Sequence, residues 1–332
     1  MSVKVQVPIS AVVITAAFFA NSATAGTLTA VKLFDVPGAS SGSTTAYNIN
    51  NSGTIAGTYL DPAVGYRVFT LTNDVYATVD PPGSVNGSSL ISINNAGQVV
   101  GFSNTATPPD YGSYYLASKG SFSAFPPPGI TLPPGASYSF YNDVGAIGGQ
   151  TATGGFIAQG SKITPITPPD GNNVTVNTIN NSNQAVGGYF PAKPPSSTAN
   201  QEGFLYGAGT FTPIYVPGSA VTYTNGISDA GVVVGYYNLA QVFPVNGVPY
   251  TPTLGFTYLN GAYTTYTVPG AIETELFAIN SAGQVVGYER DGNGVSHAFV
   301  ATAATAVPEP AALALVCAGL LGLVGLRCGR TS

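Results

Sequence analysis

Apolar and polar positions follow a nine-residue pattern that returns along this chain. The most regular copy runs from Ile93 to Gly101 and reads Ile-Asn-Asn-Ala-Gly-Gln-Val-Val-Gly. Its apolar ends enclose a short polar turn. The other copies run from Ile49 to Gly57, Tyr141 to Gly149, Ile179 to Gly187, Ile227 to Gly235 and Ile279 to Gly287. Periods of roughly 40–50 residues are typical of propellers, solenoids and other arrays.

Each copy predicts a tight β-hairpin. The last residue of a three-residue hairpin loop is commonly left-handed, a conformation that glycine adopts without a Cβ clash. The fourth copy has Asn183 there, a residue that also tolerates it. The other copies have Gly53, Gly97, Gly145, Gly231 and Gly283. The turn conformation is therefore the repeated requirement.

The turns also carry a recurring Asn or Asp. These are Asn51, Asn95, Asp143, Asn181 and Asp229. Their oxygens could form a ring of calcium ligands. We favour a simpler interpretation, in which each side chain stabilises its turn by bonding its own backbone.

Two further strands recur in each period. One is centred on an aromatic residue that we expect in the core between blades, although it could stack on carbohydrate; these residues are Phe69, Tyr115, Phe156, Phe204, Phe256 and Phe299. The other ends in proline and glycine, as at Tyr263 to Gly270, and suits an outer strand because proline cannot donate to a ladder. Four strands per period predict an all-β, six-bladed β-propeller over residues 26–302.

The chain ends predict how this propeller closes. The last aromatic strand, His297 to Ala301, is followed by no proline strand. The missing strand is present at the other end, from Leu28 to Val36. We therefore expect the N-terminal strand to complete the last blade, which would close the ring and remove exposed edges.

Composition narrows the classes of function. Charged residues make up 7% of the chain and the net charge is −5, which speaks against a nucleic-acid partner because that requires clustered Lys and Arg. Both cysteines, Cys317 and Cys328, lie in the C-terminal tail. The chain has no phosphate loop, metal-spaced His/Cys cluster or nucleophile elbow. We expect no cofactor and no metal, and we assign no catalytic residue.

The two ends predict export. Residues 1–25 read as a signal peptide, with Lys4, an apolar stretch and the small-residue site Ala23-Thr24-Ala25. After a linker at 303–306, Val307-Pro308-Glu309-Pro310 precedes an apolar run from Ala311 to Leu326. Its 16 residues form a short transmembrane helix of about 24 Å, less than the ~30 Å hydrocarbon core. Arg327 and Arg330 follow and would stay cytoplasmic.

Residues 307–332 resemble the PEP-CTERM sorting signal, with its Pro-Glu-Pro motif, hydrophobic helix and basic end. A departure is Arg327-Cys328-Gly329-Arg330 in place of a compact arginine cluster. The resemblance implies a Gram-negative bacterium and an exosortase-type processing enzyme as partner. It also implies transient inner-membrane insertion, removal of the tail, and delivery to the cell surface or the extracellular matrix. Such proteins usually accompany biofilm exopolysaccharide.

The repeats, over roughly residues 27–302, resemble the HAF family of extracellular repeats. Ile279 to Tyr288 and His297-Ala298-Phe299 fit both halves of its pattern, Ile-Asn-x-x-Gly-x-Val-Val-Gly-Tyr and His-Ala-Phe. The other copies keep the first half and usually only the aromatic residue of the second. This resemblance implies an exported β-repeat protein and no known activity.

Long connections predict the functional face, which we call the long-loop face. These connections join the second and third strands of five of the six blades: Asp61 to Gly65, Asn104 to Gly112, Phe190 to Glu202, Asn238 to Thr253 and Glu289 to Ser296. Function usually lies on variable loops over a rigid scaffold. The predicted binding residues are Tyr59, Asp61, Asp110, Tyr111, Phe190, Tyr237, Glu289 and Asp291. We expect a structural or binding role, with extracellular polysaccharide as a partner. The alternative is a polysaccharide-active hydrolase or lyase that uses paired carboxylates on this face.

Overall fold

The computed structural model describes residues 23–105, 112–170, 172–192, 201–239, 243–245 and 248–304. This part of the chain consists of strands joined by turns and loops, without a helix. The prediction of an all-β fold is confirmed. Residues 1–22 of the predicted signal peptide and the tail from residue 305 onward lie outside the described residues.

Four sheets of four antiparallel strands form blades of a β-propeller. The first contains β3 (Thr45–Ile49), β4 (Ile55–Asp61), β5 (Gly65–Thr72) and β6 (Val75–Thr78). The second contains β7 (Ser84–Ile93), β8 (Val99–Thr105), β9 (Ser113–Ser118) and β10 (Ser121–Ala124). The third contains β11 (Ser137–Tyr141), β12 (Ala146–Thr151), β13 (Gly154–Gln159) and β14 (Lys162–Ile166). The fourth contains β15 (Asn172–Ile179), β16 (Ala185–Phe190), β17 (Glu202–Gly207) and β18 (Thr210–Ile214).

A nine-stranded sheet holds the rest of the propeller. One antiparallel group is β19 (Ser219–Ile227), β20 (Val233–Leu239), β23 (Thr253–Leu259) and β24 (Ala262–Tyr266). The other is β25 (Glu273–Ile279), β26 (Gln284–Arg290), β27 (Ser296–Ala303) and β2 (Leu28–Phe34). A single parallel bridge, Thr253 with Glu273, connects them. The short strand β1 (Thr24–Ala25) pairs with β24.

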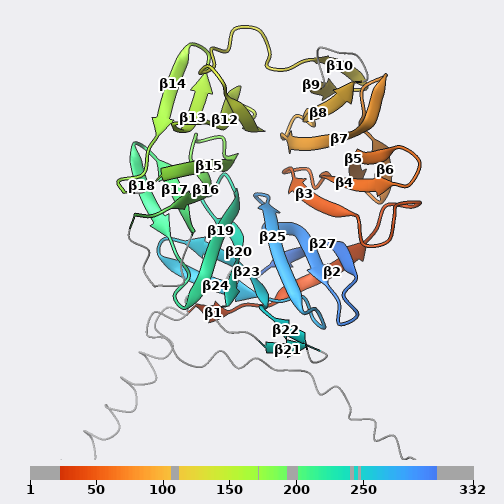
Figure 1. The fold of residues 1–332 in the computed structure, drawn as a ribbon, viewed down its shortest axis with the longest axis vertical. Helices are drawn as coiled ribbons and strands as arrows, with labels where there is room; N and C mark the ends of the chain where they lie inside the picture. Colours follow the sequence, from red (N-terminus) through yellow and green to blue (C-terminus); the bar gives the residue numbers. More distant parts are fainter. Residues whose placement is uncertain are drawn as a thin grey trace, which may run out of the picture.

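The first strands of these groups lie innermost around a common centre (Figure 1). They contact one another in the order β3, β7, β11, β15, β19 and β25, and β25 in turn contacts β3. In the blades, proline-ended strands such as β14 and β18 lie at the outer edge, with Pro165 and Pro213 in them. The predicted order of strands from the axis outward is therefore confirmed for these two blades.

The connections differ from the prediction in two places. The stretch from Asp61 to Gly65 is short, because β4 extends to Asp61 and pairs with Gly65 at the start of β5. The stretch from Asn238 to Thr253 contains an unpredicted hairpin of its own, formed by β21 (Phe243–Val245) and β22 (Val248–Tyr250). Both differences arise because pairing continues beyond the repeated apolar positions.

The final glycine of each repeat is required by close packing. In β16, a Cβ at Gly187 would overlap the carbonyl oxygen of Thr175 and would lie 3.0 Å from the Phe204 ring. The carbonyl approaches because β15 has a bulge between Val176 and Thr178. A bulge inserts an extra residue and bends its strand. Every first strand has such a register shift opposite the glycine of its own repeat.

The aromatic residues of the third strands fill the space above these glycines. All six are buried, with at most 4% of the residue exposed: Phe69, Tyr115, Phe156, Phe204, Phe256 and Phe299. The prediction that they belong to the core is confirmed. The turn prediction is confirmed as well, because Gly97 has a φ of 74° and Asn183 a φ of 56°.

We expect Gly187→Ala to lower the free energy of unfolding by about 3 kcal/mol, because overpacking against backbone atoms cannot be relieved by rotating a side chain. Gly292→Ala is the matched control, since nothing lies within 4 Å of its added Cβ. Denaturant unfolding of both variants checks this. Equal unfolding midpoints would contradict the packing explanation.

Candidate functional site

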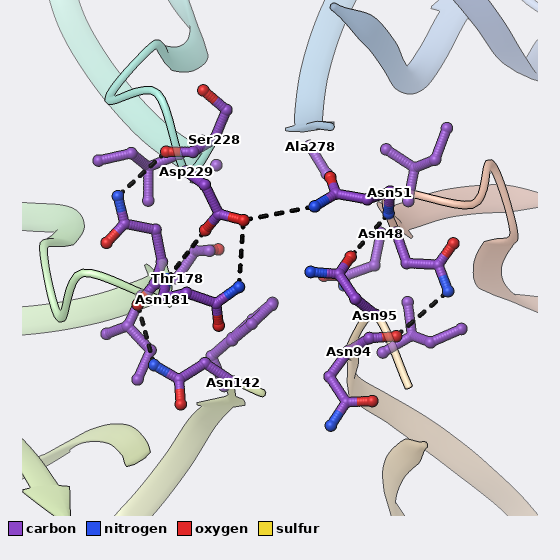
Figure 2. A pocket seen from close by; sticks show the side chains of 18 of the residues that line it. Asn48, Asn51, Asn94, Asn95, Asn142, Thr178, Asn181, Ser228, Asp229 and Ala278 are labelled. Carbon is purple, nitrogen blue, oxygen red and sulfur yellow. Dashed lines mark hydrogen bonds between the residues drawn. The ribbon is translucent and has the colours of Figure 1, made fainter. Parts of the chain in front are cut away.

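The turns between first and second strands meet at the propeller axis, and we call this side the hairpin face. They surround a cavity of about 50 Å³ (Figure 2). Its wall includes the recurring Asn and Asp residues of the turns: Asn51, Asn95, Asp143, Asn181 and Asp229. We call these five residues the axial ring.

Hydrogen bonds of the axial ring join five of these turns to the turn that follows. A backbone N–H of one turn donates to the side-chain Oδ1 of the following turn: Asn51 to Asn95 (2.7 Å), Asn95 to Asp143 (2.7 Å), Asp143 to Asn181 (3.0 Å), Asn181 to Asp229 (3.0 Å) and Ser281 to Asn51 (2.9 Å). The interpretation that these side chains bond their own backbone is therefore wrong. Their oxygens reach the neighbouring turn because the axis brings the turns together.

The residue just before each axial-ring residue is the one that hydrogen-bonds to the backbone of its own turn. Asn180 is 4% exposed, and its Oδ1 accepts from the N–H groups of Ser182 (3.1 Å) and Gln184 (2.9 Å). Its Nδ2 donates to the carbonyl oxygen of Ser228 in the next turn, at 3.0 Å. Sequence reasoning missed this residue, although Asn recurs in the same place. The equivalent residues are Asn50, Asn94, Asn142 and Asn280, with Ser228 as the exception.

The two carboxylates of the axial ring are already hydrogen-bonded. Asp143 Oδ2 accepts from the amides of Asn95 (2.6 Å) and Asn181 (2.8 Å). Asp229 Oδ2 accepts from Asn181 (3.1 Å) and, across the cavity, from Asn51 (3.3 Å; Figure 2). Within the described residues, no three or more His, Cys, Asp or Glu side chains form a group that could hold a metal ion. The hydrogen bonds of the axial ring therefore have a structural role, because they hold neighbouring turns together.

A second group near the axis combines aromatic rings with a carboxyl group, and we call it the aromatic–glutamate cluster. It consists of Tyr47, Tyr223, Tyr236, Glu275, Phe277 and Tyr288. Tyr223 and Tyr236 stack with their ring centroids 4.6 Å apart. The Phe277 ring lies 5.4 Å from Tyr47, 6.3 Å from Tyr236 and 5.8 Å from Tyr288. Three groups of strands thus contribute to one cluster.

The carboxyl group of this cluster, on Glu275, has a raised pKa. Burial raises the pKa of Glu275 to about 7, although the hydrogen bond from Tyr288 (3.1 Å) opposes the rise and the charge of Glu273 adds to it. Burial and the nearby Glu275 carboxyl also raise the pKa of the Tyr236 phenol. Near neutral pH, Glu275 can therefore both donate and accept hydrogen bonds. Tyr47, with 41% of the residue exposed, opens the cluster to solvent.

The predicted binding residues occupy different environments. Asp110 and Tyr111 lie outside the described residues. Tyr59 and Tyr237 are buried. Their ring centroids lie 6.3 Å from those of Phe69 and Phe256, respectively. Phe190 is exposed at the end of β16. That these residues bind a ligand stays a prediction.

The predicted acidic residues are also dispersed. Asp61 lies 3.6 Å from Arg67 in an ion pair, and Asp291 accepts from the backbone N–H groups of Asn293 and Val295 in its own loop. Glu289 is 2% exposed and lies opposite His297 on the neighbouring strand. Burial raises the pKa of Glu289, while His297 opposes the rise. The His297 Nδ1 is 2.8 Å from Asp35 Oδ2, just beyond β2.

Comparison with known proteins concerns the tail and the fold. The family model of the PEP-CTERM protein-sorting motif matches residues 306–330. The chain carries this sorting signal. The prediction of the sorting motif is confirmed, and the signal implies an exported protein that is sorted to the surface and recognised for exosortase processing. In the described part of the chain, no helix is long and apolar enough to cross a membrane.

Several solved structures show distant likeness. "YCF48 bound to D1 peptide" is 10% identical, with 87% of this chain and 100% of that chain covered and a TM-score of 0.43. A mutant of AofleA from Arthrobotrys oligospora is 12% identical, with 85% and 91% covered and a TM-score of 0.46. MPT-4, a mannose phosphorylase from Leishmania mexicana, is 12% identical, with 85% and 89% covered and a TM-score of 0.34. No curated protein matches the chain.

Glu275→Gln tests the buried carboxyl. Because the folded pKa of about 7 exceeds the reference value of 4.5, the contribution of this carboxyl group to stability is fully present below pH 4.5 and is lost as pH rises through 7. The glutamine variant lacks this fall and should be more stable above pH 7, by up to roughly 3 kcal/mol. Thermal unfolding across pH 4–9 checks the difference.

Tyr288→Phe is the companion variant. It removes the hydrogen bond that favours the ionised carboxylate, so the fall in stability should move to higher pH. A natural protein whose stability relative to Glu275→Gln does not change with pH would show that the carboxyl titrates normally.

Proposed function

We propose that this chain is an exported, closed six-bladed β-propeller that binds extracellular polysaccharide at the cell surface. The fold part of the proposal interprets the nine-stranded sheet as two blades. Both of its four-stranded groups have the strand order of the other blades. In the last group, β2 pairs with β27, from Leu28 with Ala303 to Phe34 with Ala298.

Hydrogen bonds between the last and the first turn support closure. Asn280 Nδ2 donates to the carbonyl oxygen of Asn50 at 3.1 Å, and Ser281 N donates to Asn51 Oδ1. These contacts repeat those between consecutive turns elsewhere in the ring. The first and last repeats would then be neighbours like any other pair.

Closure can be tested with two equivalent asparagines. Asn180 and Asn280 both accept from two N–H groups of their own turn, and both donate to the glutamine four residues on and to the next turn. In a closed ring, Asn180→Ala and Asn280→Ala should each cost about 2 kcal/mol of unfolding free energy. If Asn280→Ala costs at least ~1 kcal/mol less, the ring is open at that point. Denaturant unfolding measures both.

The binding part of the proposal rests on the aromatic–glutamate cluster. Aromatic faces offer apolar surface to the C–H face of a sugar ring, and phenol and carboxyl groups bond its hydroxyls. Glu275 and Tyr288 lie two residues from the ends of β25 and β26 at the long-loop face. The exposed Phe190 and the partly exposed Asp61 and Asp291 would extend contacts over that face.

Export completes the proposal. Residues 1–25 would be removed as a signal peptide, and Ala311 to Leu326 would hold the chain briefly in the inner membrane of a Gram-negative bacterium. An exosortase-type enzyme would then remove the tail near Val307 to Pro310. The repeats would be of the HAF type, and the protein would reside at the surface or in the biofilm matrix. The matched sorting motif at residues 306–330 supports this route.

Binding can be tested on purified residues 26–306 with a glycan array, followed by titration calorimetry. Tyr47→Ala should weaken the binding of a captured glycan about tenfold, which corresponds to ~1.4 kcal/mol. Tyr66→Ala removes an exposed tyrosine on β5, with 56% of the residue accessible, and should leave the affinity unchanged.

Three outcomes would contradict the binding proposal. The natural protein could retain no glycan, or both variants could bind equally well. Release of new reducing ends from a bound glycan would instead show the polysaccharide-active enzyme.

A further inference from the structure

The chain leaves the propeller at a fixed point on the hairpin face. Ala303 N donates to the carbonyl oxygen of Gly283, at the tip of the β25–β26 turn, at 3.1 Å. Ala304 makes two hydrogen bonds to the propeller. Its N–H donates to the carbonyl oxygen of Thr27, and its own carbonyl oxygen accepts from the Tyr266 hydroxyl at 2.8 Å. The tail therefore starts from the same face as the axial ring.

The tether that follows is short. The matched sorting motif begins at residue 306, and the apolar run begins at Ala311. Six residues lie between Ala304 and Ala311, and the seven steps from one Cα to the next reach at most about 25 Å when fully extended. The eight residues of β27 already span about 25 Å between the two faces of the propeller. A tether from the hairpin face therefore has no length left to bring the long-loop face to a membrane.

The hairpin face is suited to a close approach. Its turns are short, with small exposed residues such as Ser52 and Ala96, and its axial carboxylates Asp143 and Asp229 are bonded by asparagine amides. The opposite face carries the longer connections, including the β21–β22 hairpin. A level polar face can lie closer to a lipid surface than one with projecting loops.

We propose that, until the tail is processed, the hairpin face is held against the lipid bilayer and the long-loop face points away from it. This inference rests on the proposed membrane insertion of residues 311–326. It places the end of the aromatic–glutamate cluster marked by Glu275 and Tyr288 on the side that extracellular polymer can reach. The protein would then be able to engage a glycan before its release.

The experiment uses the full chain with Pro308, Glu309 and Pro310 changed to alanine, which should prevent processing. Cys317 and Cys328 are replaced by serine, and one new cysteine is introduced for a fluorescent label. Ala96→Cys marks the hairpin face, and Ala63→Cys marks the loop between β4 and β5 on the other face. Both positions are exposed turn residues, so they form a matched pair. The proteins are reconstituted into phosphatidylcholine vesicles containing a headgroup-linked quencher.

We expect the label at position 96 to be quenched at least ~2-fold more than the label at position 63, because about 25 Å separates the faces. A flexible 15-residue Gly/Ser insertion after Ala304 should remove this difference by lengthening the tether. Equal or reversed quenching without the insertion would overturn the orientation. Failure of the protein to sediment with vesicles would overturn the membrane segment of the proposed function, and the orientation with it.

Discussion

The rest of this structure depends on a buried asparagine at the start of every hairpin turn except the one that begins with Ser228. Its oxygen stabilises its own turn, and its amide passes a hydrogen bond to the next turn, as Asn180 does toward Ser228. A buried amide left without partners costs about 1–3 kcal/mol. Because one side chain serves two repeats, the local turn and the spacing between blades are satisfied together. Losing it would loosen an interface as well as a turn.

The packing between strands depends on a second constraint, the glycine at the end of each repeat. The bulged first strand brings a carbonyl oxygen so close to Gly187 that no side chain fits, and the Phe204 ring covers the remaining space. Glycine is costly in a strand, since it loses the most conformational freedom on folding. Its recurrence is explained by the bulge and the ring, which would both have to move for any larger residue.

The sequence predicted the scaffold better than the site. Glycine, proline and aromatic residues report directly on left-handed turns, outer strands and core, and these predictions hold at Gly97, Pro165 and Phe204. The contacts of Asn51 with Asn95 were missed because nothing local shows that residues 44 apart are neighbours at an axis. Burial of Tyr59 and Tyr237 was missed for a related reason. The alternation of apolar and polar residues along one strand does not show which side chains a neighbouring blade covers.

The bulge also separates what must stay constant from what can vary. Its extra residue has no paired partner in the adjacent strand, so strand pairing does not restrict the type of residue at that position. It is Tyr47, Ile91, Ser139, Asn177, Asn225 or Phe277 in successive repeats. The aromatic–glutamate cluster uses two of these positions, Tyr47 and Phe277. The turns and glycines maintain the propeller scaffold, while the bulges place differing side chains around its axis. A ligand site built there can change without loss of the fold.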